Sequence, residues 1–167
     1  GITLWVVSTV VFHFVLFGVV ATRIGLGQLF IDLAYCAAGR YSGGPAKVSV
    51  LSSAMFGMLS GSSIANTVTT GTFTIPMMKR VGFSATKAGA VEVSSSVNGQ
   101  IMPPVMGAAA FLMVEYVGIP YIEVIKHAFL PAVISYIALL YIVHLEALKA
   151  GMQGLPSGNP QRPWLNK

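Results

Sequence analysis

Charged residues are scarce in this sequence. Only 9% of its 167 residues are Asp, Glu, Lys or Arg, and just five of them are acidic, whereas about 25% of an average soluble domain is charged. Its mean hydropathy is +0.75. A chain with so few charges cannot cover a surface that faces water. The sequence therefore predicts a protein that meets the lipid bilayer over much of its length.

Cysteine is almost absent, and the basic residues are dispersed. A single Cys36 excludes an internal disulfide, and it lacks the companion ligands that a metal site needs, so no cofactor is predicted. The net charge is +5, but the ten Lys and Arg residues stand singly except for Lys79–Arg80. Because they form no basic stripe, nucleic acid is not expected as a partner.

The N-terminal end also lacks the features of a signal peptide. It begins at Gly1 and enters an apolar run directly, without a charged n-region or a small-residue cleavage site. The expectation is an internal or trimmed piece of a longer membrane protein.

Apolar stretches divided by turn residues predict an all-α integral membrane fold, with transmembrane helices, one re-entrant helical hairpin and one broken helix. The predicted units are a transmembrane helix over 1–23, an interfacial arm helix and loop over 24–47, a re-entrant hairpin over 48–79, a broken transmembrane helix over 88–117, an interfacial segment and transmembrane helix over 118–148, and a polar cytoplasmic tail over 149–167.

The hairpin is predicted from length and from the charges that flank it. Residues 48–78 form a stretch too long for one ordinary span and too short for two, and both of its ends are basic. Its middle, residues 57–71, reads GMLSGSSIANTVTTG and is rich in small and hydroxyl side chains. Irregular backbone at membrane depth is tolerated only where it faces protein or a watery cavity. The tip should therefore line a site.

A second polar centre interrupts the helix expected over residues 88–116. It reads SSSVNGQIMPP, residues 94–104. Pro103 and Pro104 remove two backbone donors, and Gly99 weakens the helix further. Two half-helices joined by an unwound stretch near mid-membrane are therefore expected. Glu92 lies on the first half.

The distribution of basic residues gives an orientation. With spans over 2–22, 88–116 and 128–147, nine of the ten Lys and Arg residues fall on one side of the membrane and only Lys126 falls on the other. The positive-inside rule then places the nine, and the C-terminal tail, in the cytoplasm.

The two polar centres contain groups that suit a small cation and an anion. An Asn carbonyl, Ser and Thr hydroxyls and freed backbone carbonyls are neutral oxygens, which fit a weakly held monovalent ion such as Na⁺. The second hairpin arm starts near Thr67, and the positive end of its dipole would attract an anionic substrate group. For individual hydroxyls the structural alternative is a bond back to the helix, and Gly57 and Gly61 also form a GxxxG packing pair.

Two stretches resemble a known family. SSAMFGMLSGSSIANTVTTGTFTIPMMKRVGF, residues 52–83, and AGAVEVSSSVNGQIMPPVMGAAAFLMVEYVGIPY, residues 88–121, resemble the membrane permease of the tripartite ATP-independent periplasmic (TRAP) transporters. The likeness runs over about residues 17–147 and is greatest to the large fused permeases that work with TAXI-type solute-binding proteins.

The resemblance implies a sodium-driven importer of organic acids with an elevator-type transport domain in the bacterial inner membrane. It implies as partners a periplasmic solute-binding protein, the other half of the permease and a small membrane subunit or its fused equivalent. Na⁺ would be the coupling ion, and no enzymatic activity is expected. The residues assigned to a sodium and substrate site are Ser60, Ser62, Ser63, Asn66, Thr67, Ser96, Asn98, Gly99 and Pro103.

Two features qualify that assignment. The family more often has Gly at the position of Asn98, so an amide there either adds a ligand or crowds the ion. The family also implies an inverted repeat, of which this chain contains one hairpin and one broken helix, so we expect one half of the transport unit.

Two other functions fit polar groups inside a bilayer. An intramembrane serine protease is disfavoured because Met58 stands where a GxSG motif needs Gly, and the His residues lie on other segments. A channel or structural membrane subunit is the stronger alternative, although a channel would have polar faces along full spans rather than two helix breaks.

Overall fold

The computed structural model describes residues 4–5, 8–9 and 12–152, and its regular elements are all helices, with no strand among these residues. The elements are α2 (Phe12–Arg23), α3 (Leu26–Ala38), α4 (Gly44–Ser60), α5 (Ser63–Arg80), α6 (Ala85–Asn98), the 3₁₀ turn η2 (Gly99–Ile101), α7 (Ala108–Val117) and α8 (Tyr121–Lys149). The all-α class is therefore confirmed. The tail over 153–167 and much of the predicted first span lie outside the described residues.

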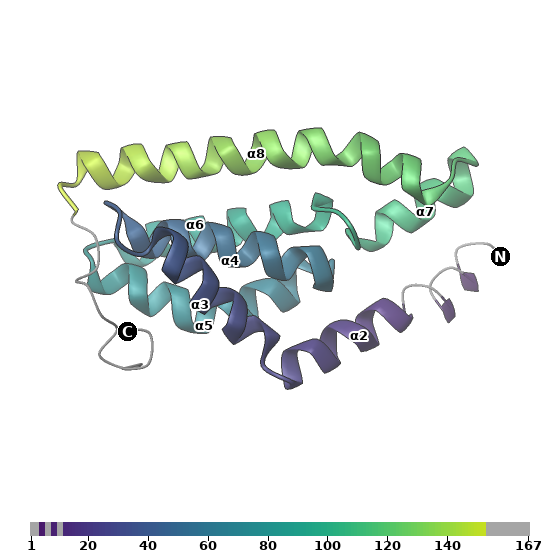
Figure 1. Ribbon diagram of the computed structural model, residues 1–167, viewed down its shortest axis with the longest axis horizontal. Helices are drawn as coiled ribbons and strands as arrows, with labels where there is room; N and C mark the ends of the chain where they lie inside the picture. The colour runs from purple at the N-terminus through teal and green to yellow at the C-terminus, as the bar shows by residue number, and fades with distance from the viewer. Residues whose placement is uncertain (1–3, 6–7, 10–11, 153–167) are drawn as a thin grey trace.

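Helices α3 to α6 pack together on one side of the molecule, and α7 lies beyond the end of α6 (Figure 1). Ile31, Ala34 and Ala38 of α3 bury their side chains against Val48 of α4. Helix α4 begins immediately after Gly43, whose φ of 68° is in the left-handed region, and Pro45 occupies its first turn, where a missing N–H is tolerated. The turn chemistry before residue 45 thus ends one helix and starts the next.

Helices α4 and α5 form a helical hairpin with a two-residue turn. Gly61 ends α4 with a φ of 58° and its N–H is bonded to the Gly57 carbonyl. Ser62 then caps α5, because its side-chain oxygen accepts a hydrogen bond from the Ala65 N–H at 3.3 Å. A hairpin was predicted over this stretch, and the structure begins its first arm earlier, at Gly44. Whether the hairpin is re-entrant stays a prediction.

The broken helix is present, with its break shifted toward the C-terminus. Residues 94–98 remain helical in α6, and the irregular stretch runs from Gly99 to Gly107. The cause is the reach of proline, whose ring clashes with the carbonyl four residues before it. Pro103 and Pro104 therefore disturb residues 99 and 100 and leave the preceding turns intact.

Helix α8 is one continuous helix of 29 residues, whereas the sequence analysis divided this region into an interfacial segment and a span. Residues 121–127 join the helix because Val124 is buried against Met106 and Ala110. At 1.5 Å per residue α8 is about 43 Å long, and it runs beside α4, α6 and α7 (Figure 1).

By length and composition, α8 is the one helix in the described residues that is able to cross a bilayer. Only 17% of its apolar window is buried inside the molecule, so most of that surface faces outward. The opposite side of α8 packs on the core, where Tyr136, Val143 and Ala147 meet Val50 and Met78.

Candidate functional site

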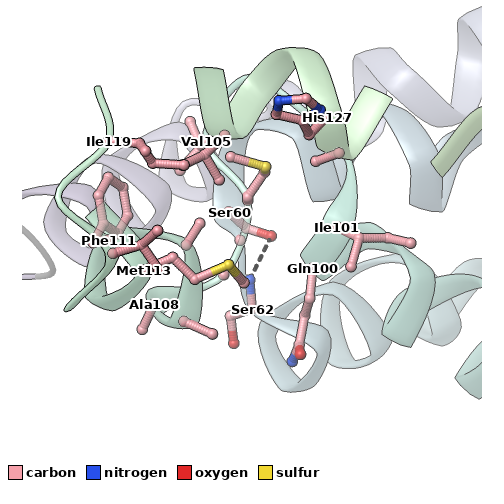
Figure 2. A pocket seen from close by; sticks show the side chains of 18 residues that line it. Ser60, Ser62, Gln100, Ile101, Val105, Ala108, Phe111, Met113, Ile119 and His127 are labelled. Carbon is pink, nitrogen blue, oxygen red and sulfur yellow. Dashed lines mark hydrogen bonds between the residues drawn. The ribbon is translucent and has the colours of Figure 1, made fainter. Parts of the chain in front are cut away.

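A pocket of about 660 Å³ lies at the hairpin tip (Figure 2). The turn between α4 and α5 contributes Ser60, Gly61 and Ser62, and the break contributes Gln100, Ile101 and Val105. The remaining wall comes from α7, from the connection that follows it and from the start of α8, and it is largely apolar, as Phe111, Met113 and Ile119 show in Figure 2. The two polar centres of the sequence therefore meet at one cavity.

Two helix N-termini border this pocket. Ser62, the N-cap of α5, lines it. Gly107, the N-cap of α7, and Ala108 to Ala110 of the first turn line it as well. The first N–H groups of any helix lack intrahelical acceptors, and the helix dipole adds positive potential at that end. Together these ends favour the binding of an anionic group such as a carboxylate.

Direct hydrogen bonds join the hairpin tip to the break. The Gln100 side-chain amide donates to the Ser63 hydroxyl at 2.7 Å. The Val105 N–H of the break donates to the Met58 carbonyl of α4 at 3.3 Å. Within the break itself, the Gly107 N–H donates to the Gln100 carbonyl at 2.7 Å. These contacts hold the break against the tip at the wall of the pocket.

Glycine allows the closest approaches between these segments. A Cβ atom on Gly61 would lie 1.8 Å from the Met106 carbonyl oxygen. A Cβ on Gly57 would lie 2.5 Å from the Gly99 Cα. Real Cβ atoms never approach other atoms so closely, so α4 crosses the break at a distance that only glycine permits.

A second polar group lies deeper between the same helices. Glu92 of α6 is 0% exposed, and five hydroxyl groups surround its carboxylate. We call this set the Glu92 cluster; its members are Glu92, Ser49, Ser53, Thr70, Thr74 and Ser96. The Ser49 hydroxyl donates to Oε2 at 2.7 Å, and the Ser53 hydroxyl is 3.4 Å from Oε1. In the described part of the chain, no buried side-chain nitrogen or oxygen lacks a hydrogen-bond partner.

Comparison with known proteins connects this arrangement to a family. The model of the "Tripartite ATP-independent periplasmic transporter, DctM component" matches residues 3–165. The chain belongs to this family. DctM proteins are integral membrane permeases of transporters rather than enzymes, so the protease alternative is excluded. His127 of α8 does line the pocket that contains Ser60 (Figure 2), which sequence reasoning did not indicate.

Individual relatives agree with the DctM assignment. The chain is 29% identical over 137 residues to the uncharacterized protein y4mL of Sinorhizobium fredii, which covers 82% of this chain and 32% of that protein. It is 31% identical over 91 residues to the 2,3-diketo-L-gulonate TRAP transporter large permease protein YiaN of Escherichia coli (54% and 21% covered). It is 26% identical over 155 residues to the C4-dicarboxylate TRAP transporter large permease protein DctM of Pseudomonas aeruginosa (91% and 35% covered). The chain thus spans about a third or less of the length of these relatives.

Five of the residues that the sequence assigned to a site in this DctM segment fall into two groups. Ser60 and Ser62 line the pocket, and Ser63 accepts the bond from Gln100 beside it. Asn66 and Ser96 are buried deeper. The Asn66 side-chain amide donates to the Ser53 carbonyl at 2.9 Å, and the Ser96 hydroxyl faces Glu92.

The other assigned residues lie along the hairpin and the break. Thr67 is half-buried on α5, and Asn98 is the last residue of α6. Gly99 and Pro103 are buried in the break. A Cβ on Gly99 would lie 2.9 Å from the Asn66 side-chain nitrogen, so the second hairpin arm and the break are in contact. Sodium binding by any of these residues stays a prediction.

Sequence reasoning did not identify the Glu92 cluster as a unit, although a signal for it exists. Its members occur as three pairs four residues apart, Ser49 with Ser53, Thr70 with Thr74, and Glu92 with Ser96. Residues at this spacing lie on one face of a helix. Three helices that each carry such a polar pair in an apolar setting are candidates to face one another.

Proposed function

We propose that this segment forms one wall of the substrate and cation site of a sodium-coupled secondary transporter that imports carboxylates. The observation that carries the proposal is the pocket bordered by the N-termini of α5 and α7. Such a site suits a carboxylate, while the Ser60 and Ser62 oxygens and the carbonyls of the break are neutral ligands suited to Na⁺.

The names of two relatives support the substrate class. One is described as acting on 2,3-diketo-L-gulonate and the other on C4-dicarboxylates, and both are organic acids. The family description names a tripartite periplasmic transporter of which DctM is one component, in agreement with delivery by a solute-binding protein. The TAXI type of that protein, the inner-membrane location and the cytoplasmic basic side remain part of the proposal.

The elevator mechanism fits the same arrangement. The hairpin, α6 and the break would move as one body carrying the pocket, and α3 would link this body to a scaffold. The other half of the permease, with a second hairpin, would close the pocket on its apolar side.

The test uses the full-length permease in proteoliposomes with its solute-binding protein and a panel of labelled C4-dicarboxylates and sugar acids. We expect saturable uptake when an inward sodium gradient is present and none when choline replaces sodium. Ser60→Ala should raise the KM for the acid or for sodium several-fold, whereas Thr72→Val, on the exposed face of α5, should leave both unchanged. Unsaturated, ohmic current would instead support a channel and overturn the proposal.

A further inference from the structure

The carboxylate of Glu92 contacts both arms of the hairpin at once. Its oxygens receive hydrogen bonds from Ser49 of α4 and from Thr70 and Thr74 of α5. The arms therefore cannot slide past α6, or separate from it, without breaking bonds to a buried acid. Each of these hydroxyls has one hydrogen to donate, and a carboxylate has about four lone-pair sites to accept them.

Gly71 permits this arrangement. A Cβ atom at Gly71 would lie 3.1 Å from the Glu92 Cγ, which is closer than most Cβ contacts. The lack of a side chain at position 71 lets the glutamate pass between the arms.

A series of contacts connects the Glu92 cluster to the pocket. Asn66 lies one turn before Thr70 on α5, and its amide bonds the Ser53 carbonyl of α4. The same amide meets Gly99, where α6 ends. The next residue, Gln100, bonds Ser63 at the hairpin tip and lines the pocket. The position of the pocket wall thus follows from how the hairpin is fixed against α6.

We propose that Glu92 is a positioning residue, which fixes both hairpin arms to α6 so that the tip and the break keep the placement that forms the pocket. This inference rests on the proposed function for its transport consequence, but not for its structural one. Glu92 acts through Asn66 and Gln100 and not on a ligand, because neither Glu92 nor any of its hydroxyl partners lines the pocket.

The structural consequence can be tested by cross-linking in the full-length permease. Ser63→Cys and Gln100→Cys would be combined in a background with Cys36→Ser and without other accessible cysteines, and bridged with a short bifunctional thiol reagent. Glu92→Gln keeps the size of the side chain but replaces an acceptor oxygen with an N–H donor. It should lower the cross-linking yield several-fold. Glu115→Gln, at an exposed acid on α7, is the matched control and should leave the yield unchanged.

A second pair of variants keeps the test decisive if Glu92→Gln does not accumulate in the membrane. Thr70→Val removes a donor and keeps the shape of the side chain, and it should lower the yield. Thr70→Ser restores the hydroxyl and should recover the yield. Thr72→Val, whose hydroxyl bonds only along its own helix to Thr69 at 3.1 Å, should have no effect.

Uptake measured without the cysteine pair separates positioning from stability. We expect Glu92→Gln and Thr70→Val to raise the KM for the substrate several-fold more than they lower the maximal rate per folded permease. The inference is overturned if thermal stability falls while cross-linking and KM stay at the level of the control variants. If Glu92→Gln and Thr70→Val lower the cross-linking yield but the parent permease shows no sodium-dependent uptake, the proposed function is overturned and the positioning role of Glu92 stays supported.

Discussion

The middle of the hairpin and its tip contain similar polar side chains in opposite situations. In the Glu92 cluster, hydroxyls of both arms are buried and bonded to one carboxylate. At the tip, Ser60, Ser62 and Gln100 border a pocket of about 660 Å³. Buried polar groups must be satisfied within the protein, whereas those that line a cavity are available to a ligand. The comparison shows that polar residues in an apolar chain do not by themselves indicate a binding site.

This difference explains why the Asn66 side chain bonds to the protein and does not line the pocket. Asn66 is the only amide on the second hairpin arm, and it is one of the residues that the sequence assigns to the ion site. In the structure its side-chain nitrogen donates to Ser53 and its Oδ1 is 3.4 Å from the Thr70 hydroxyl. Asn66 therefore belongs to the contacts that hold the arms together, and an Asn66→Ala variant would disturb the packing of α4 against α5.

The largest effect is expected from Gly61→Ala at the tip. Gly61 has a φ of 58°, and an added Cβ would lie 1.8 Å from the Met106 carbonyl oxygen. The turn cannot relieve a clash between two backbones, so the permease should lose nearly all uptake and most of its yield in the membrane. Uptake per folded permease and detergent-extracted yield would measure this.

Gly118→Ala separates the clash from backbone strain. Gly118 has a φ of 75° with no atom within 4 Å of an added Cβ. Gly118→Ala should lower the free energy of unfolding by only about 1–2 kcal/mol, the usual penalty of a left-handed conformation for an L-residue. Equal losses of uptake and of membrane yield in Gly61→Ala and Gly118→Ala would show that the contact between the tip and the break is unimportant.

Two serine substitutions should distinguish the Glu92 cluster from the pocket by their effects on stability. Ser49→Ala removes a 2.7 Å hydrogen bond to buried Glu92 and should lower the free energy of unfolding by about 1–3 kcal/mol. It should also raise KM, because it loosens the contact of α4 with α6. Ser60→Ala at the pocket should change stability by no more than about 0.5 kcal/mol and raise KM several-fold. Thermal unfolding in detergent and initial uptake rates measure the two quantities. A loss of stability in Ser60→Ala, with none in Ser49→Ala, would mean that the hydroxyl at the tip and not the one bonded to Glu92 holds the helices together.

Much of this organisation follows from the sequence, for identifiable reasons. The hairpin was predictable from the length of its stretch and the basic residues at both ends. The break was predictable because Pro103 and Pro104 act on their own neighbourhood, where local sterics carry the information. The continuity of α8 was not, because it depends on Val124 packing against α7. Likewise, a polar pair four residues apart does not reveal what it faces. The convergence of three helices on Glu92 and the contribution of α7 to the pocket depend on contacts between residues far apart in the sequence, and therefore could not be predicted from local patterns.

The smallest effect is expected at an exposed ion pair that also joins two helices. Lys87 of α6 contacts Glu146 of α8, with side chains 55% and 34% exposed. Ion pairs in contact with water contribute about 0–1 kcal/mol because solvent and salt screen them. Lys87→Ala should therefore lower the free energy of unfolding by less than about 1 kcal/mol, and added salt should remove the difference. Chemical or thermal unfolding in detergent at two salt concentrations would measure it.

The result would establish which contacts attach α8 to α6 and to the hairpin. Tyr136 of α8 donates a buried hydrogen bond to the Ser95 carbonyl at 2.8 Å, and Val143 and Ala147 are packed in the core. If these contacts carry the attachment, Lys87→Ala should resemble a variant of the local Lys126–Glu123 pair, which lies within α8 alone. A much larger loss for Lys87→Ala would mean that an exposed charge, rather than buried packing, keeps α8 in place. Two kinds of polar contact would then hold the helices together. Buried hydrogen bonds to Glu92 join α6 to the hairpin, and the exposed Lys87–Glu146 ion pair joins α6 to α8.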